Sequence, residues 1–228
     1  MSSYKIISVG GSIIIPKDGF KIAFLTKFRQ LILNEVKKGY KFVFIVGGGA
    51  TCRYYQRAAQ AVTKLSNEDL DWLGIHSTIF NANFVKLLFG NLAYEEVVTD
   101  PTKKISTTKP IIIGAGWKPG WSTDYVAVSQ AKTYRAEEVI NLSNIEYVYD
   151  KDPKKYKKAK KIEEITWADF RRDIVGYKWQ AGKNVPFDPV ASSLAEKMKL
   201  KVSILDGTDL KQVKNVLEGK KFKGTVIS

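Results

Sequence analysis

Phe42-Val43-Phe44-Ile45-Val46-Gly47-Gly48-Gly49 says more about the structure of this chain than any other segment. Its first five residues are apolar, β-branched or aromatic, and predict a buried strand. Three glycines follow, and residues 50–59 are typical of a helix. A strand, a glycine turn and a helix together aim backbone N–H groups and a helix N-terminus at an anion. The segment therefore predicts a phosphate-binding turn.

The same arrangement occurs twice more. Ile6-Ile7-Ser8-Val9 is followed by Gly10-Gly11-Ser12, and Ile111-Ile112-Ile113 is followed by Gly114-Ala115-Gly116. Glycine lets a backbone approach a ligand without obstruction by a Cβ atom, although tight turns alone would also explain it. Three such turns in 228 residues indicate a substrate that carries several phosphates.

Hydrophobic periodicity divides the remaining chain into alternating strands and helices. This order predicts an α/β protein, a three-layer αβα sandwich with a mostly parallel central sheet. The predicted strands are Tyr4–Val9, Lys41–Val46, Val97–Val98, Pro110–Ile113, Glu138–Leu142, Val202–Leu205 and Thr225–Ile227. The predicted helices cover Lys21–Lys38, Gly49 to about Ala61, the segment from the Ser66 cap to about Phe89, Asp124–Lys132, Trp167–Val175, Val190–Met198 and about Asp209–Leu217.

Composition narrows the function classes. The formal net charge is +14, which favours polyanionic ligands, although a lysine-rich solvated surface would give the same value. Lysine is spread over both ends and the middle of the chain, and Asp150 to Lys161 form a lysine-rich loop. The single cysteine, Cys52, indicates a reducing compartment. No apolar run approaches the ~20 residues that span a bilayer, and no signal peptide is evident. We therefore expect a cytoplasmic protein with no membrane partner.

Six sequence motifs follow one another in a characteristic order. They are Val9-Gly10-Gly11-Ser12; Val46-Gly47-Gly48-Gly49 with Arg53; Asp71-Trp72-Leu73-Gly74-Ile75 with Thr78 and Asn81; Pro119-Gly120-Trp121-Ser122-Thr123-Asp124; Ser143-Asn144 with Val148-Tyr149-Asp150-Lys151-Asp152-Pro153-Lys154-Lys155; and Phe187-Asp188-Pro189. Each is weak alone, but in this order and spacing they resemble the amino-acid-kinase-fold family, most closely its archaeal uridylate (UMP) kinases.

The resemblance covers nearly the whole chain and implies one amino-acid-kinase-like domain over 1–228. It implies an acceptor half at about 1–135 and an ATP half at about 136–228. The implied reaction is ATP-dependent phosphorylation of UMP to UDP by in-line transfer, with ATP and Mg²⁺ as cofactors. The implied assembly is a homohexamer.

The resemblance also assigns site residues. Asp124 and Arg53 would be catalytic, because phosphoryl transfer depends on alignment and charge neutralisation. The alternative for Asp124 is a plain helix cap, and for Asp71 a helix-terminal charge. The UMP-binding residues would be Gly48, Asp71, Thr78, Asn81, Trp117, Lys118, Pro119, Gly120, Trp121, Ser122 and Thr123. The ATP-binding residues would be Gly10, Gly11, Gly49, Arg53, Ser143, Asn144, Tyr149 and Asp152. His76 is the sole histidine, and we predict no dedicated protein metal site.

The sequence departs from the family pattern at two informative places. Many kinases of this fold carry a lysine just before the first glycine pair, where this chain has Ile7-Ser8-Val9. Lys118 is a candidate to replace it. Tyr147 stands where the family usually has glycine, so its ring must change the local loop or fill the adenine pocket.

Two other functions stay open on the sequence alone. One is a kinase of the same fold that acts on another small phosphate or carboxylate, although Asp71, Thr78 and Asn81 favour a nucleoside. The other is a non-catalytic nucleotide-binding or storage module, which Tyr147 and the missing lysine motivate. Nucleic-acid binding is expected to be at most non-specific, because the chain lacks a recognition helix or an aromatic RNA-reading motif.

Overall fold

The structure is a computed structural model that describes residues 4–178 and 185–228. The sequence predicts a loop over residues 183–189, and its first two residues, Lys183 and Asn184, lie outside these ranges. Eight strands form the central sheet in the order β3-β4-β2-β1-β5-β9-β10-β8. Their bounds are β3 Ala93–Val98, β4 Ile111–Gly114, β2 Lys41–Val46, β1 Tyr4–Val9, β5 Glu138–Ser143, β9 Lys201–Asp206, β10 Thr225–Ile227 and β8 Glu164–Ile165. The first six are parallel, and β10 and β8 run opposite to them. The prediction of a mostly parallel sheet is confirmed.

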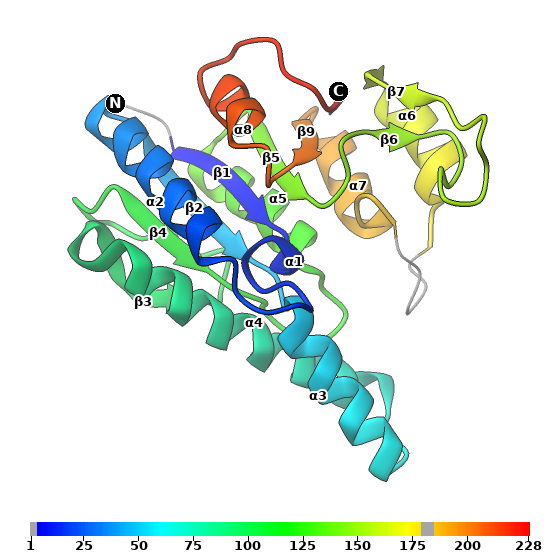
Figure 1. The fold of residues 1–228 in the computed structure, drawn as a ribbon, viewed down its shortest axis with the longest axis horizontal. Helices are drawn as coiled ribbons and strands as arrows, with labels where there is room; N and C mark the ends of the chain where they lie inside the picture. Colours follow the sequence, from blue (N-terminus) through cyan, green and yellow to red (C-terminus); the bar gives the residue numbers. More distant parts are fainter. Residues whose placement is uncertain (1–3, 179–184) are drawn as a thin grey trace.

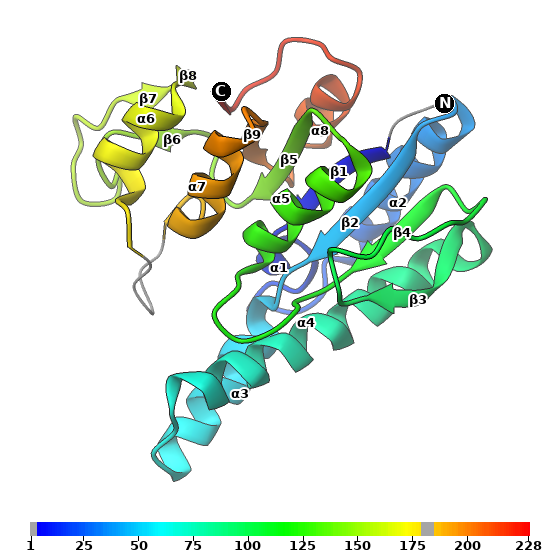
Figure 2. The same cartoon turned by 180° about the vertical axis from the view of Figure 1, so that it is seen from behind.

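Helices cover both faces of the sheet, as predicted. One face packs against α1 (Gly11–Ile14), α2 (Ile22–Lys37), α4 (Asn67–Phe89) and α8 (Leu210–Leu217) (Figure 1). The other packs against α5 (Thr123–Tyr134) and α7 (Pro189–Lys197), seen from behind in Figure 2. Alternate strand residues enter opposite cores: Ile6 packs on the α5 side and Ile7 on the α2 side. Burial on both faces explains the continuous apolar runs of β1 and β2.

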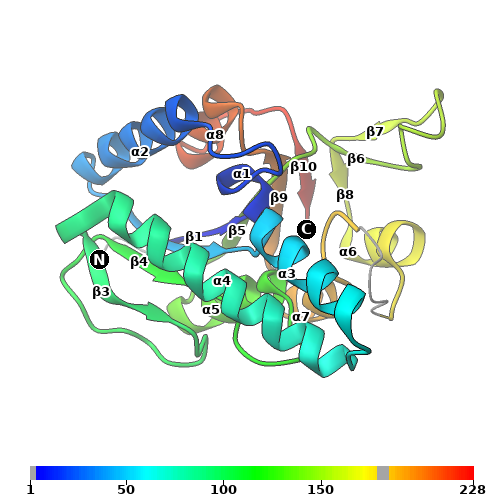
Figure 3. The same cartoon turned by 60° about the horizontal axis from the view of Figure 1, so that its bottom comes forward.

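The start of α4 follows directly from the sequence. The Ser66 hydroxyl accepts from the Asp69 amide at 3.1 Å, and the Asp69 carboxylate accepts from the Ser66 amide at 2.9 Å. This reciprocal capping box satisfies two backbone donors at the helix terminus. α4 then runs for 23 residues beside α3 (Gly49–Val62), and the two helices extend together past the sheet (Figure 3). Neither these helices nor any other in the described residues has the apolar length to cross a bilayer.

Several short elements were not predicted. β3 begins at Ala93, not Val97, because its pairing with β4 continues through a register shift that breaks the alternation of exposed and buried residues. The lysine-rich segment lies in a hairpin between β6 (Val148–Tyr149) and β7 (Lys161–Ile162). The helix predicted over 167–175 begins as α6 (Trp167–Asp169) and continues as a π-helix, Phe170–Val175. Elements of two to four residues, such as α1, are too short to leave a periodic pattern.

Candidate active site

The ends of five parallel strands bring the glycine-rich turns to one edge of the sheet. Gly10 follows β1, Gly47 follows β2, Gly114 ends β4, Ser143 ends β5 and Gly207 follows β9. In open α/β sheets, ligands bind outside the carboxyl ends of the strands. The turns are also cross-linked there, since the Gly10 amide donates to the Leu142 carbonyl at 2.9 Å and the Gly207 amide to the Ser143 carbonyl at 2.9 Å.

The first two glycine turns touch each other. A Cβ atom on Gly11 would lie 2.1 Å from the Gly49 nitrogen and 2.6 Å from the Gly47 oxygen. A Cβ on Gly49 would lie 2.5 Å from the Gly11 oxygen, and Gly49 also has a φ of +58°. Backbone approach this close excludes every residue but glycine at both positions. The two glycine signals in the sequence therefore describe one contact between two turns.

The contact leaves four backbone donors unused. In the described part of the chain, the amides of Gly11, Ser12, Gly48 and Gly49 donate to no protein acceptor. Gly48 and Gly49 open α3, a helix of 14 residues, whose N-terminus carries a partial positive charge. Free amides at a helix N-terminus form an anion site. This edge can therefore bind phosphate.

α4 holds these loops in place through three polar side chains. The Asn81 amide nitrogen donates to the carbonyls of Gly47 at 3.0 Å and Gly48 at 2.9 Å. The Thr78 hydroxyl accepts from the Gly116 amide at 2.8 Å. One Asp71 carboxylate oxygen accepts from the Gly120 amide at 2.8 Å, and the side chain remains partly exposed. Asp71 is thus the member of this set that keeps access to a ligand.

Asp124 lies in the first turn of α5, beside β1. One of its carboxylate oxygens accepts from the Ser8 hydroxyl at 3.4 Å and the other from the Asp188 amide at 3.2 Å. Protein surrounds the carboxyl group, which still keeps some exposure, and this burial raises the pKa of Asp124 to about 7. The nearby Asp188 carboxyl also raises this pKa, whereas the hydrogen bonds from the Asp188 amide and the Ser8 hydroxyl lower it. Ser122, not Asp124, caps α5, because its hydroxyl accepts from the Tyr125 amide. The plain-cap alternative for Asp124 is therefore wrong.

Sequence reasoning did not assign Ser8 or Asp188 to the site. Asp188 caps α7, accepting from the Val190 and Ala191 amides at 2.7 Å each, and burial raises the pKa of its carboxyl group as well. Ser8 is buried on β1. The Asp188-Pro189 pair is a recognisable helix-start signal, but nothing local in the sequence links it to Asp124.

An aromatic cluster lines the loop before α5. Trp121 lies 3.9 Å from Tyr125 and 6.2 Å from Trp117, measured between ring centroids. The Lys118 ammonium lies 4.1 Å from the Trp117 centroid, so Lys118 is held by this cluster through a cation–π contact. Pro119 and Thr123 complete the same loop, with Thr123 opening α5.

Arg53 is exposed one turn into α3. Burial raises the pKa of the neighbouring Cys52 thiol; the Arg53 guanidinium opposes this rise, and the Asp71 carboxylate adds to it. Arg53 and Asp71 therefore flank the same point on α3. A Cβ on Gly48 would meet the Cys52 Cβ at 2.6 Å, so this point adjoins the glycine turn.

The predicted ATP-side residues are less closely gathered. Asn144 and Asp152 are exposed, and Tyr149 is half-buried on β6. The Asp152 carboxylate accepts from the Lys154 amide at 2.9 Å, so it also shapes the hairpin turn. Tyr147 is buried, and the Lys161 ammonium lies 4.7 Å from its ring centroid. Tyr147 thus serves to hold β7 against the loop that follows β5.

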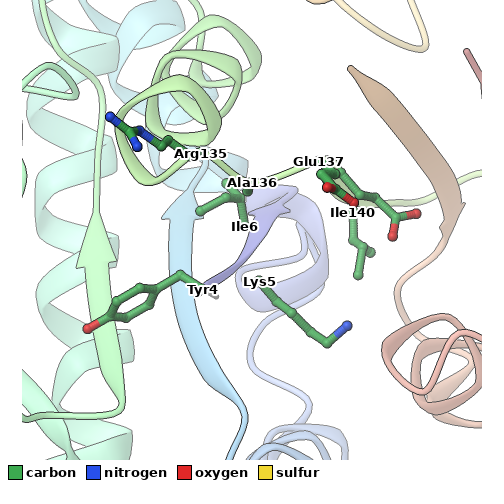
Figure 4. Close-up of a pocket in the computed structure, with 8 residues that line it drawn as sticks. Tyr4, Lys5, Ile6, Arg135, Ala136, Glu137 and Ile140 are labelled. Carbon is green, nitrogen blue, oxygen red and sulfur yellow. The ribbon is translucent and has the colours of Figure 1, made fainter. Parts of the chain in front are cut away.

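A cavity of about 270 Å³ lies at the opposite edge of the sheet (Figure 4). Its walls come from the start of β1 and the connection between α5 and β5. The Lys5 and Arg135 side chains point away from each other in this view, so their charges do not converge on one ligand. The cavity is therefore separate from the glycine turns and is a weaker candidate site.

Comparison with known proteins adds independent findings. The family model described as the amino acid kinase family matches residues 3–206. The uridylate kinase of Methanocaldococcus jannaschii is 30% identical over 224 residues, covering 97% of this chain and 98% of that protein. The uridylate kinase of Thermococcus kodakarensis is 32% identical, with the same coverage. The crystal structure of uridylate kinase from Archaeoglobus fulgidus superimposes with a TM-score of 0.81 at 25% identity, covering 97% of this chain and 99% of that one.

Proposed function

This chain belongs to the amino acid kinase family, and we propose that it is a nucleoside monophosphate kinase that transfers a phosphoryl group from ATP to UMP. The observation that carries the proposal is the meeting of the Gly11 and Gly49 turns, which leaves free amides at two helix N-termini. Two phosphate-bearing substrates must be brought together for in-line transfer, and paired anion sites at one sheet edge do this.

Each half of the chain has a role in the proposal. The acceptor half, about 1–135, would bind UMP through Gly48, Asp71 and the loop 117–123. The ATP half, about 136–228, would bind the nucleotide through Ser143, Asn144, Tyr149 and Asp152, with its phosphates on Gly10, Gly11 and Gly49. Arg53 would neutralise phosphate charge as transfer proceeds, since a guanidinium makes bidentate contacts with phosphate oxygens. Asp124 would orient the groups around the transferring phosphoryl.

The site chemistry also fits Mg²⁺ that arrives with ATP. Among the described residues no cluster of three or more acidic, histidine or cysteine side chains forms a metal cage. Mg²⁺ commonly uses one or two carboxylates together with substrate phosphates, and the neighbouring carboxylates of Asp124 and Asp188 would supply such oxygens. A bound Mg²⁺ would neutralise charge on the transferring phosphates. The residues of this chain would hold and orient that assembly.

A coupled assay with ATP and a panel of acceptors tests this function. We expect turnover with UMP to exceed turnover with CMP, dUMP, AMP and small carboxylate acceptors. Phosphorylation of a non-nucleotide acceptor alone would assign the chain to another kinase of the same fold. Nucleotide binding without turnover of any acceptor would favour a storage module.

Replacement of Asp71 by Asn should weaken UMP binding while leaving ATP binding nearly unchanged. In this proposal the partly exposed carboxylate would accept from the acceptor ribose, and loss of one charge-assisted hydrogen bond costs about 1.5–3 kcal/mol. Calorimetric titration with each nucleotide measures the effect. Glu68→Gln, an acidic residue in the first turn of the same helix, is the matched control. Equal weakening of UMP binding and ATP binding would show that Asp71 is not part of the acceptor site.

Self-association is part of the proposal, with a homohexamer as the expected size. α4 presents Trp72, Phe80 and Leu87 on its outer face, with exposed fractions of 41%, 71% and 75%. Their spacing places them on one stripe of the helix, which is typical of a helix–helix contact. The first turn of α4 is acidic and its last turn carries Lys86, so a second copy packed antiparallel would pair opposite charges.

Replacement of Phe80 by Asp should therefore reduce the assembly to a smaller species. A charge in the centre of an apolar contact cannot be solvated or paired there. Light scattering coupled to size-exclusion chromatography measures the mass. Tyr177→Asp changes an aromatic residue of similar exposure, 64%, on another surface and should leave the mass unchanged. An unaltered mass for the Phe80 variant would show that α4 is not the contact.

The proposal also includes a cytoplasmic location and, at most, non-specific affinity for nucleic acid. The hairpin lysines attract polyanions at low salt. We expect any binding of RNA or DNA to fade steeply as salt is added.

A further inference from the structure

We propose that Asn81 is a positioning residue that fixes the phosphate-binding peptides of the Gly47–Gly49 turn without touching the nucleotide itself. The inference deepens the proposed function and rests on it. It gives Asn81 a role different from the one that sequence resemblance implies, which is direct contact with UMP.

Both donor hydrogens of the Asn81 side chain are already used within the protein. It is fully buried, with an exposed fraction of 0%. Its Nδ2 group has two hydrogens, and they are directed at the carbonyls of Gly47 and Gly48, at 3.0 and 2.9 Å. Its Oδ1 accepts from the Thr51 hydroxyl at 3.2 Å, which fixes which way the amide faces. A contact with the nucleotide would require these bonds to break.

Peptide geometry links the Asn81 hydrogen bonds to the direction of the Gly48 and Gly49 amides. The Gly47 carbonyl shares a peptide plane with the Gly48 amide, and the Gly48 carbonyl shares one with the Gly49 amide. In a trans peptide the C=O and N–H bonds point in opposite directions. By binding both carbonyls, Asn81 turns the Gly48 and Gly49 amides away from α4. These are the amides that no protein acceptor uses in the described part of the chain.

Backbone bonds hold the ends of this turn, because the Gly47 amide donates to the Val9 carbonyl at 3.0 Å and the Cys52 amide donates to the Gly48 carbonyl at 3.1 Å. Asn81 adds two side-chain hydrogen bonds to the peptides between them. A glycine peptide is conformationally permissive, and three in succession would sample many orientations. A preorganised donor avoids the cost of ordering when the anion binds. Asn81 supplies that order from a helix already anchored by its capping box and by its buried face.

The test compares ligands that share a nucleoside and differ in phosphate. Asn81→Ala should raise the dissociation constant of UMP at least tenfold and that of inorganic pyrophosphate similarly. Its effect on the inhibition constant of uridine should stay within twofold, because uridine has no phosphate for the turn to bind. Asn83→Ala is the matched control, since Asn83 lies on the same helix and, among the residues that the structure describes, its side chain bonds only to the Ile79 carbonyl of that helix.

Equal losses for uridine and UMP would overturn the inference and make Asn81 a direct nucleoside ligand. Unchanged affinity for UMP and pyrophosphate would overturn it as well. If Asn81→Ala does not fold, Thr51→Val keeps the volume but frees the Asn81 amide to turn. Thr51→Val should weaken the binding of UMP and pyrophosphate by a smaller factor than Asn81→Ala does, and should leave the binding of uridine unchanged. Because pyrophosphate reports on the turn alone, the test still distinguishes this inference from a failure of UMP to be the acceptor.

Discussion

Asp124→Asn should lower kcat by about 10²-fold or more while raising the thermal stability of the protein at pH 8. The amide is isosteric with the carboxylate and keeps both hydrogen bonds, because the Ser8 hydroxyl can accept from Nδ2 while Oδ1 accepts from the Asp188 amide. What disappears is the negative charge. That charge is proposed to organise the transferring phosphoryl, so its loss should affect kcat more than either KM.

The stability gain follows from the sign of the pKa shift. The folded protein raises the pKa of Asp124 to about 7, above the ordinary value of about 4. Between these two values the folded state binds a proton that the unfolded state has lost, so stability falls as pH rises from about 4 to 7. Asn carries no such penalty. The gain should be on the order of a few kcal/mol at pH 8 and vanish near pH 4.

Two measurements check the Asp124 prediction. Thermal unfolding at pH 5 and pH 8 compares the variant with the parent protein, and steady-state kinetics gives kcat and both KM values. The parent should lose activity as pH falls through about 7, as Asp124 becomes protonated. A fall in kcat of less than about tenfold would mean that Asp124 has a structural role and not a catalytic one. An unchanged stability at pH 8 would mean that burial does not penalise the charged carboxylate.

Gly11→Ala should abolish nucleotide binding and destabilise the fold by about 3 kcal/mol or more. The added Cβ would lie 2.1 Å from the Gly49 nitrogen and 2.6 Å from the Gly47 oxygen. Both atoms are backbone, so no rotamer change relieves the overlap, and the two turns must separate. Separation moves the free amides of α1 and α3 apart, and with them the two proposed phosphate sites.

Gly74→Ala is the control for this prediction. Its Cβ would meet Cys52 and Gln56 side-chain atoms at 3.6 and 3.7 Å, which are ordinary contacts, and Ala is the better helix former. Denaturant unfolding and equilibrium dialysis with ATP measure the two effects. A Gly11 variant that binds ATP normally would show that the turns are not the phosphate site.

The main elements could be predicted because their signals are local. The run from Phe42 to Val46 is buried on both faces and therefore apolar throughout, and Ser66 with Asp69 encodes its capping box within four residues. β8 and the β6–β7 hairpin could not be predicted, because two-residue strands are defined by their partners. The segment Glu164–Ile165 becomes a strand only when it pairs with β10.

The site divides in the same way. The assignment of Gly11, Gly48 and Asp124 to the candidate site follows from the order of the sequence motifs alone. The environment of Asp124 does not, because Ser8 lies 116 positions away and Asp188 lies 64 positions away. The resemblance predicts that Thr78 and Asn81 bind UMP. Their contacts with Gly116 and with the Gly47 and Gly48 carbonyls could not be predicted, because they form only where α4 packs against the loops at the end of the sheet.

The position of β1 between β2 and β5 determines when each of its edges can pair during synthesis on the ribosome. β1 pairs with β2 soon after both are made, but its other neighbour is β5, where Ile6 meets Val139. At roughly 5–20 residues per second, the edge of β1 stays unpaired for many seconds of synthesis. A bare apolar strand edge is a site for aggregation during that interval. Nascent chains that stall before β5 should therefore depend on chaperones more than completed ones.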